Sequence, residues 1–495
     1  MASSLPVEVW LHIAQFIPTN EIRSLLALNR LFYDLAMDAR YEDINIDEVS
    51  QEAFNKVCRL VDPSVASRVR RLRLQLNQVT KLRLAPSIPS WDVLRRLTTS
   101  FPNLRPSRAL LGLNNSAKSS AFKRNTSLAG LVEALIAVLP GMVNVEEFTV
   151  SSWNTLSTAD LEPFFSTAWS GFGSKLRKLS LGGNIEGFKV LLTARPVLTA
   201  VEELHLEFTD NMNPPLPNSP EAVHGAAATQ TLLLDFVAPF INDLSTQLQV
   251  LKLWSWASID LSIFFQRLGP FPMLHTFSIW AAFNRSFAHD PSGLTRILYG
   301  TCLTLKDLTL RLNPLGLFNS QADLVLCQWL SETVQNDQFG TGLRCLQLYP
   351  STEPNLDSLV AIIQRSAKTL EQLNVRDRYL RLPETTRIAE ALSHFTTVTR
   401  LRLNVRTLPV ELLDLFAHSL PNLKHLGLRA ADGEPTADFG TQLKTRRYDN
   451  WKLWNIGIWQ GANELDYETM VILAASSGAK ATRRGLTKGN IEKRT

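Results

Sequence analysis

A short pattern of apolar residues recurs along most of this chain and constrains its fold more than any other feature. Three apolar positions are separated by two residues and then by one, as in LRKLSL from Leu176 and VEELHL from Val201. This spacing puts the last two apolar side chains on one face of a strand. Twelve copies begin at Val69, Val145, Leu176, Val201, Leu248, Leu274, Leu305, Leu343, Leu370, Val398, Leu423 and Trp451. One copy also occurs in ordinary amphipathic segments, but twelve predict a series of equivalent strands.

The spacing between copies indicates how these strands are connected. Several neighbouring copies begin about 25 to 28 residues apart, and helical periodicity fills the segments 185–196, 258–268, 355–369 and 409–420. This is the leucine-rich-repeat pattern, whose usual period is about 20–29 residues. Because helical crossovers between parallel strands are right-handed, we expect an α/β fold over residues 69–478. The expected architecture is a curved leucine-rich-repeat solenoid with a concave parallel sheet and helices on the convex side.

Two irregular stretches interrupt the repeats. The long gap between Val69 and Val145 has room for one or two degenerate copies, and residues 108–116 (RALLGLNNS) are one candidate. The number of copies between residues 77 and 145 stays open. A Pro-rich segment at 211–228 is predicted to be an insertion, and insertions in a solenoid become surface loops.

The N-terminal segment follows a different, helical pattern. Residues 5–18 (LPVEVWLHIAQFIP) place Leu5, Val9, Ile13, Phe16 and Ile17 on one stripe of a 3.6-residue period. Pro6 suits the first helical position, and Pro18 ends the helix. A second helical stretch is predicted over residues 20–41. We therefore divide this region into a helical module at 1–46 and a linker helix at 47–68.

The helical module resembles the F-box, a motif of roughly forty residues that often precedes leucine-rich repeats. The matching positions are Leu5, Pro6, Glu8, Val9, Ile13, Phe16, Ile17, Pro18, Glu21, Ile22, Leu25, Leu28, Arg30, Phe32 and Leu35. The sequence departs from the family at Asn29, where a small apolar residue is common, and at Phe32, where tryptophan is common.

The resemblance implies a function. F-box proteins are substrate-recognition subunits of SCF-type E3 ubiquitin ligases: the F-box docks on a Skp-type adaptor, which binds a cullin, and the repeats bind a protein substrate. On this basis the adaptor contacts are predicted at Leu5, Pro6, Val9, Ile13, Phe16, Ile17, Leu25 and Leu28. The alternative is a non-catalytic leucine-rich-repeat scaffold whose F-box-like segment is a solenoid cap or adaptor tether.

Charge and composition narrow the function classes. The net charge is +5, and the tail from Lys480 alone holds six basic residues and one acid, so the rest of the chain is formally neutral. This distribution argues against a nucleic-acid partner and predicts a basic disordered tail at 479–495. No apolar span is long enough for a transmembrane helix, and no signal peptide is recognised. We expect a cytoplasmic or nuclear protein without membrane contact.

Catalytic and metal-binding motifs are absent from the sequence. It contains no phosphate-binding loop and no HExxH pair, and its four cysteines lie far apart without a CxxC spacing. We therefore expect no metal, no cofactor and no catalytic residue. If the chain promotes ubiquitin transfer, it positions the substrate while other subunits supply the chemistry.

The last prediction concerns the strand residues that alternate with the core. Seven of them are candidate substrate contacts, because exposed tryptophan, tyrosine and arginine are enriched at binding hot spots: Trp254, Trp280, Arg311, Tyr349, Arg376, Arg402 and Arg429. They would form a stripe that is aromatic at one end and basic at the other, suited to an apolar anchor beside an acidic or phosphorylated stretch. The alternative is that other segments cover the tryptophans and that acids such as Asp307 and Asp377 pair with the arginines.

Overall fold

The computed structural model divides the chain into two units, Met1–Gln247 and Leu248–Thr495, each treated by itself. It describes residues 6–25, 27–75, 128–151, 158–193, 196–209, 220–257, 259–287, 290–312, 320–348, 355–393, 395–431, 439–460, 463–464, 471–473 and 475–476. Leu5, Tyr349, the candidate repeat at 108–116, residues 211–219 of the Pro-rich segment and the basic tail lie outside these residues. The prediction that the Pro-rich segment is a loop is wrong for residues 220–228, which form the start of helix α10 (Pro220–Leu232).

The first unit contains a parallel sheet whose strands follow the order of the chain. Its strands are β1 (Asp43–Ile46), β2 (Arg71–Gln75), β3 (Glu147–Ser151), β4 (Lys178–Gly183) and β5 (Glu203–Phe208). Its helices are α1 (Val7–Gln15), α2 (Thr19–Ile22), α3 (Arg30–Tyr41), α4 (Gln51–Arg59), α5 (Pro63–Ala66), α7 (Leu128–Val138), α8 (Thr158–Phe172), α9 (Ile185–Thr193), α10 (Pro220–Leu232) and α11 (Ala238–Leu244).

The second unit repeats this arrangement. Its strands are β6 (Val250–Ser255), β7 (Thr276–Trp280), β8 (Asp307–Arg311), β9 (Cys345–Leu348), β10 (Gln372–Leu380), β11 (Arg400–Val405), β12 (His425–Ala430), β13 (Asn455–Gln460) and β14 (Asn463–Glu464). Its helices are α12 (Ser262–Arg267), α13 (Phe283–Ser286), α14 (Ser292–Gly300), α15 (Ser320–Val334), α16 (Asn355–Arg365), α17 (Leu382–Ser393), α18 (Val410–Ser419) and α19 (Phe439–Lys444). Neighbouring strands pair in parallel except β14, which pairs antiparallel with β13.

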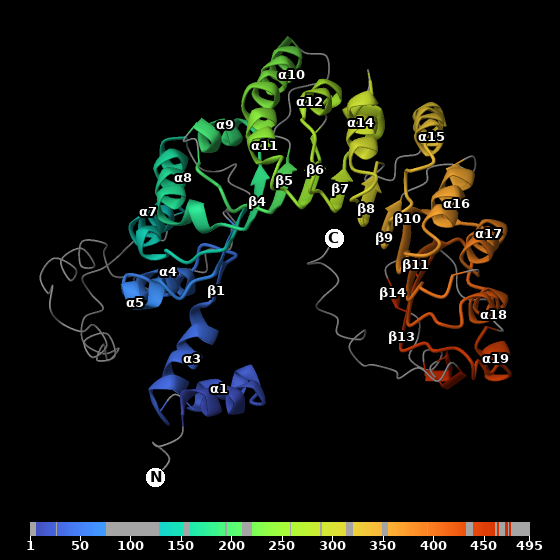
Figure 1. The fold of residues 1–495 in the computed structure, drawn as a ribbon, viewed down its shortest axis with the longest axis horizontal. Helices are drawn as coiled ribbons and strands as arrows, with labels where there is room; N and C mark the ends of the chain where they lie inside the picture. Colours follow the sequence, from blue (N-terminus) through green and yellow to red (C-terminus); the bar gives the residue numbers. More distant parts are fainter. Residues whose placement is uncertain are drawn as a thin grey trace, which may run out of the picture. The chain divides into compact units, whose positions relative to one another are not determined.

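The repeat pattern explains why strands and helices form separate layers. In each unit the strands line one side and the helices the other (Figure 1). The apolar positions of neighbouring repeats are in register, as in Leu251, Phe277 and Leu308, and all three side chains are fully buried against the helices. The α/β leucine-rich-repeat solenoid predicted from the sequence is confirmed. We call the opposite side of each sheet, which carries none of the labelled helices of the described residues, its strand face.

The last predicted repeat was placed two residues too early. The sequence assigned its pattern to WKLWNI from Trp451, but Ile456 pairs with Leu426 and Ile458 pairs with Leu428, so the repeat is LWNIGI from Leu453. Either register puts an apolar residue at the first position of the pattern, Trp451 or Leu453, and the side chains of both are buried. In the observed register Trp454 takes a position outside the core and is 65% exposed.

The N-terminal region differs from its prediction in three places. The single helix expected over 20–41 is broken, because Asn29 caps α3 by accepting a hydrogen bond from the backbone N–H of Phe32 at 3.0 Å. The linker predicted as one helix is two helices, since Asp62 caps a new helix at Pro63. The segment Asp43–Ile46 inside the predicted helical module is strand β1, which pairs with β2.

Candidate binding surfaces

Helix α1 is apolar on more than one side. Its predicted stripe includes Val9 and Ile13, yet Val7 and Leu11, which lie off that stripe, are also exposed. Only Ala14 of this helix is buried, and the Trp10 ring packs edge-on against Phe32 with centroids 5.6 Å apart. A helix that is apolar all round is normally buried. The exposed side of α1 therefore has the character of an interface.

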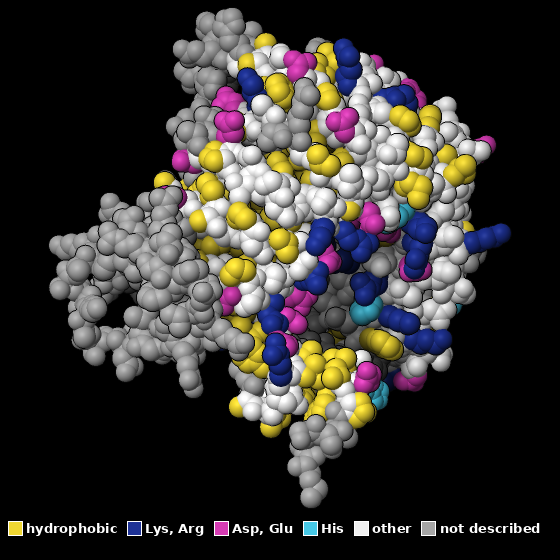
Figure 2. Space-filling view, turned by 60° about the vertical axis from the view of Figure 1, so that its left-hand side comes forward, with side chains coloured by type: hydrophobic (Ala, Val, Ile, Leu, Met, Phe, Trp, Pro, Cys, Tyr) yellow, Lys and Arg dark blue, Asp and Glu magenta, His cyan; other side chains and the backbone are white. Residues whose placement is uncertain are grey.

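Further apolar side chains extend this surface beyond α1. Phe16 is 76% exposed and Leu28 is 63% exposed, while Ile17 and Leu25 are half-buried and Pro6 is exposed. We define the N-terminal apolar surface by its exposed members, which are Val7, Val9, Leu11, Ile13, Phe16 and Leu28. Figure 2 shows hydrophobic side chains gathered at the N-terminal end of the molecule, at the bottom of the view. Sequence reasoning missed Val7 and Leu11 because it followed a single helical stripe.

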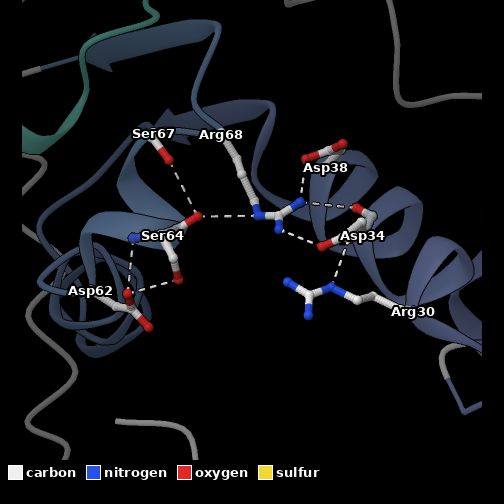
Figure 3. A network of polar contacts seen from close by, with 7 residues as sticks. All are labelled: Arg30, Asp34, Asp38, Asp62, Ser64, Ser67 and Arg68. Carbon is white, nitrogen blue, oxygen red and sulfur yellow. Dashed lines mark hydrogen bonds and ion pairs between the residues drawn. The ribbon is translucent and has the colours of Figure 1, made fainter. Parts of the chain in front are cut away.

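A polar network ties the N-terminal helices to the first repeat (Figure 3). Residue Arg68 lies just after α5. Its guanidinium donates hydrogen bonds to the Asp34 and Asp38 carboxylates of α3 at 2.7 and 2.6 Å. The same guanidinium also donates to the backbone oxygens of Asp34 and Ser64 at 3.1 Å each. Burial alone would lower the pKa of Arg68, but its bonds to the two carboxylates raise that pKa above its usual value. Helix α3 is thereby held in a fixed position against α5.

The second candidate surface is the strand face of the second unit. Trp254 pairs with Trp280, which pairs with Arg311, so three neighbouring strands carry these residues at one position. The rings of Trp254 and Trp280 have centroids 4.9 Å apart, and Trp256 lies 4.8 Å from Trp280. We call Trp254, Trp256 and Trp280 the tryptophan cluster. Trp256 was missed from the sequence because it follows the end of β6.

The tryptophan cluster touches the first arginine of the predicted stripe. The guanidinium carbon of Arg311 lies 3.7 Å from the centroid of the Trp280 ring, which is a cation–π contact. Trp254 and Trp280 are half-buried, whereas Trp256 is 38% exposed and presents the open edge of the cluster. The structure thus brings together the aromatic end of the stripe and the start of its basic end.

The remaining arginines lie on β10, β11 and β12. Arg376 donates from Nε to the Asn374 side-chain oxygen at 2.9 Å, and Arg429 is exposed at the end of β12. Arg402 is exposed but lies two residues earlier along its strand than the other members of the stripe, because it pairs with Asn374 and Gly427. The predicted partner Asp307 instead accepts from the Thr276 hydroxyl at 3.1 Å. The side chain of Asp377 is outside the described residues.

A basic potential on this part of the strand face is reflected in His425. Burial lowers the pKa of His425, and the charges of Arg400 and Lys424 lower it further. Arg400 is exposed beside His425 in the neighbouring strand. We call Arg376, Arg400, Arg402 and Arg429 the basic strand face.

The described residues contain neither a metal-binding cluster nor a membrane-spanning helix. Among them, no group of three or more His, Cys, Asp or Glu side chains could hold a metal ion. No helix in the described part of the chain has the length and apolar character needed to cross a membrane.

Comparison with known proteins adds no family assignment. No family model matches the sequence. No curated protein matches it. Similar solved structures include the Rad7–Elc1 complex in yeast, at 12% identity and a TM-score of 0.37, over 63% of this chain and 70% of that one. A Bacteroides fragilis protein has 13% identity and a TM-score of 0.31, over 60% and 68% of the two chains. The TLR13–ssRNA13 complex has 15% identity and a TM-score of 0.28, over 65% and 37%.

Proposed function

We propose that this chain is a substrate-recognition subunit of an SCF-type E3 ubiquitin ligase. The N-terminal helices dock on a Skp-type adaptor and through it on a cullin, and the repeats bind a protein substrate. The chain itself carries out no chemistry: it positions the substrate for enzymes in the same complex.

The observation that supports this proposal most directly is the N-terminal apolar surface. Phe16 and Leu28 expose more than half of their side chains, at 76% and 63%, together with four further apolar residues nearby. Large apolar side chains that are exposed together on one short segment are typical of protein–protein contacts. Its position agrees with the adaptor contacts that the F-box resemblance implies. The Arg68 network supports the same role, because an adaptor bound there would be held rigidly relative to the first repeat.

The experiment is a double substitution in this surface. Ile13→Asp with Phe16→Asp places two carboxylates where the adaptor would bury apolar side chains, and central interface residues are typically worth about 2 kcal/mol or more each. We expect co-precipitation of a Skp-type adaptor to be lost while the thermal unfolding transition stays in place, because both residues are exposed.

A matched control separates adaptor binding from general surface effects. Val197 is 68% exposed on the turn before β5, far along the chain from α1. Val197→Asp should leave adaptor binding unchanged. Undiminished co-precipitation by the double variant would refute the proposed docking surface.

A second candidate function has its own supporting observation. Strand β1 pairs with β2, so the N-terminal region adds a strand at the start of the first unit's sheet. A strand edge left open invites aggregation. We propose as the alternative that the N-terminal region acts as a cap: β1 covers the edge of β2, and as an edge strand of only four residues it limits further pairing. A scaffold with a cap alone would keep its partners after the Ile13→Asp, Phe16→Asp change.

A further inference from the structure

The strand faces of the two units differ in how their charges are neutralised. In the first unit, Asp43 forms ion pairs with Arg71 at 3.3 Å and Arg73 at 3.5 Å, and Glu203 pairs with Lys178 at 3.2 Å. Cross-strand pairs of opposite charge stabilise a sheet and leave little net field. The charges on the strand face of the first unit therefore largely neutralise one another.

The basic strand face of the second unit has no such balance. No aspartate or glutamate occupies the outward positions of β9, β11 and β12, nor those of β10 up to Arg376. Within the described part of the chain, Arg376, Arg400 and Arg429 form no ion pair, and Arg376 bonds only to the neutral Asn374. Like charges on adjacent strands destabilise a sheet. The contacts of the described residues give no structural reason for placing Arg376, Arg400 and Arg429 together.

We propose that the second unit binds a protein segment in which an apolar side chain is followed by a short run of anionic groups. The apolar side chain packs on the tryptophan cluster, and the anionic groups, carboxylates or phosphates, bind the basic strand face. Arginine is suited to both anions because its planar fork donates two parallel hydrogen bonds. This inference deepens the proposed function, since it names the substrate chemistry that the repeats would recognise.

The sheet geometry sets the spacing of the motif. Neighbouring strands lie about 4.8 Å apart, so three strand steps from Trp280 on β7 to Arg376 on β10 span about 14 Å, and two more to β12 add about 10 Å. An extended peptide advances about 3.3 Å per residue. A segment crossing the strands would therefore place its first anionic group about four residues after the apolar anchor and its last about seven residues after it.

The arrangement favours a protein segment over a nucleic acid. Surfaces that bind single-stranded nucleic acid place stacking rings along the same groove that tracks the phosphates. Here the rings and the charges are segregated: the tryptophan cluster lies at β6 and β7, and Arg376, Arg400 and Arg429 lie at β10 to β12. Arg311 already stacks on Trp280 at the boundary between them. Segregation matches a ligand that has one apolar end and one anionic end.

The test is fluorescence anisotropy with the purified full-length chain and no adaptor. The probe is a labelled synthetic peptide with one leucine, three neutral residues and four glutamates; companion peptides replace the glutamates by glutamines or by phosphoserines, or the leucine by serine. We expect the glutamine peptide to bind about tenfold more weakly or worse, because it loses charged hydrogen bonds. The phosphoserine peptide distinguishes a phosphorylated source from an acidic one by binding more tightly or more weakly than the glutamate peptide.

Two variants assign the ends of the peptide to the two parts of the site. Arg376→Gln with Arg429→Gln should weaken binding of the glutamate peptide about tenfold or more. Lys368→Gln with Lys444→Gln removes the same charge from exposed sites off the strand face and should change the affinity little. Trp256→Ala should abolish the difference between the leucine and serine peptides while keeping the dependence on charge.

Several outcomes would overturn the inference. Equal binding of the glutamate and glutamine peptides, or equal loss in both charge variants, would remove the basic strand face as the anion site. Tighter binding of a single-stranded oligonucleotide would point to nucleic acid. Binding seen only after Asp432, Glu434 and Asp438 are neutralised would mean that the chain's own acidic segment occupies the face. Since no adaptor is present, none of these results depends on the outcome of the co-precipitation experiment.

Discussion

The pKa of His425 is lowered first by burial of its ring and then by nearby positive charges, which include Arg400 of the basic strand face. Burial of its ring disfavours the imidazolium form, and Arg400 and Lys424 add electrostatic repulsion. The sequence indicated that His425 lies in a repeat strand, but its neighbours depend on the register between β11 and β12, which pairs Arg400 with His425. The change in its titration when a neighbouring charge is removed therefore reports the contribution of that charge.

We predict that Arg400→Gln raises the pKa of His425 toward its ordinary value near 6.5, measured by NMR titration of the ring protons. The sign for stability follows from the lowered folded-state pKa. The unfolded chain protonates first as the pH falls, so the contribution of His425 to stability is present above about pH 6.5 and is lost as the pH falls through its folded-state pKa. Arg400→Gln should reduce this loss. Lys368→Gln serves as the control, and an unchanged His425 titration in the Arg400 variant would contradict the assigned cause.

At the scale of elements, the sequence predicted the repeat strands better than it predicted the segments that flank them. The apolar pattern located eleven strands in register because every copy has the same buried positions, as Leu401 and Leu426 illustrate. It misplaced the last copy because Trp451 and Leu453 are both apolar. Strand β1 was missed although YEDINI from Tyr41 has the spacing of the repeats, because tyrosine takes the place of the first leucine or valine. Two of the three residues of the tryptophan cluster were predicted. The alternation of residues along the strands located Trp254 and Trp280, but Trp256 follows the end of its strand, where this alternation no longer applies.

The attachment of α3 to α5 gives a prediction at the same scale. Arg68→Gln removes the charged hydrogen bonds to Asp34 and Asp38 and should lower the free energy of unfolding by about 1–2 kcal/mol. We expect hydrogen exchange of the α3 amides to accelerate, because the helix loses its fixed contact with the first repeat. Arg30→Gln is the matched control: Arg30 also faces Asp34, but at 3.9 Å and with 95% of its side chain exposed, so its loss should have little effect. Equal acceleration in both variants would show that Arg68 does not hold the helix.

At the scale of the whole molecule, each repeat packs mainly against its two neighbours. Phe148 on β3 is fully buried: its ring contacts those of Phe164, Trp169 and Phe172 on α8 of its own repeat, and on the neighbouring strands it pairs with Leu72 of β2 and Leu179 of β4. Phe277 on β7 occupies the equivalent position of its own repeat and is also fully buried. In repeat proteins, stability is approximately a sum of repeat and nearest-neighbour terms. A destabilising substitution at one such position should therefore affect its own repeat and the two adjacent repeats only.

Phe148→Ala and Phe277→Ala form a matched pair that tests this property. Each should destabilise its own repeat by about 3–5 kcal/mol, because a buried aromatic ring is replaced by a cavity. Hydrogen–deuterium exchange should accelerate in β2, β3 and β4 with α8 for Phe148→Ala, and in β6, β7 and β8 for Phe277→Ala, while β11 and β12 keep their protection in both. Uniform acceleration across every strand would mean that the chain unfolds as one cooperative body. Local loss would mean that the basic strand face keeps its structure when the first repeats are damaged, so peptide binding by Phe148→Ala should persist.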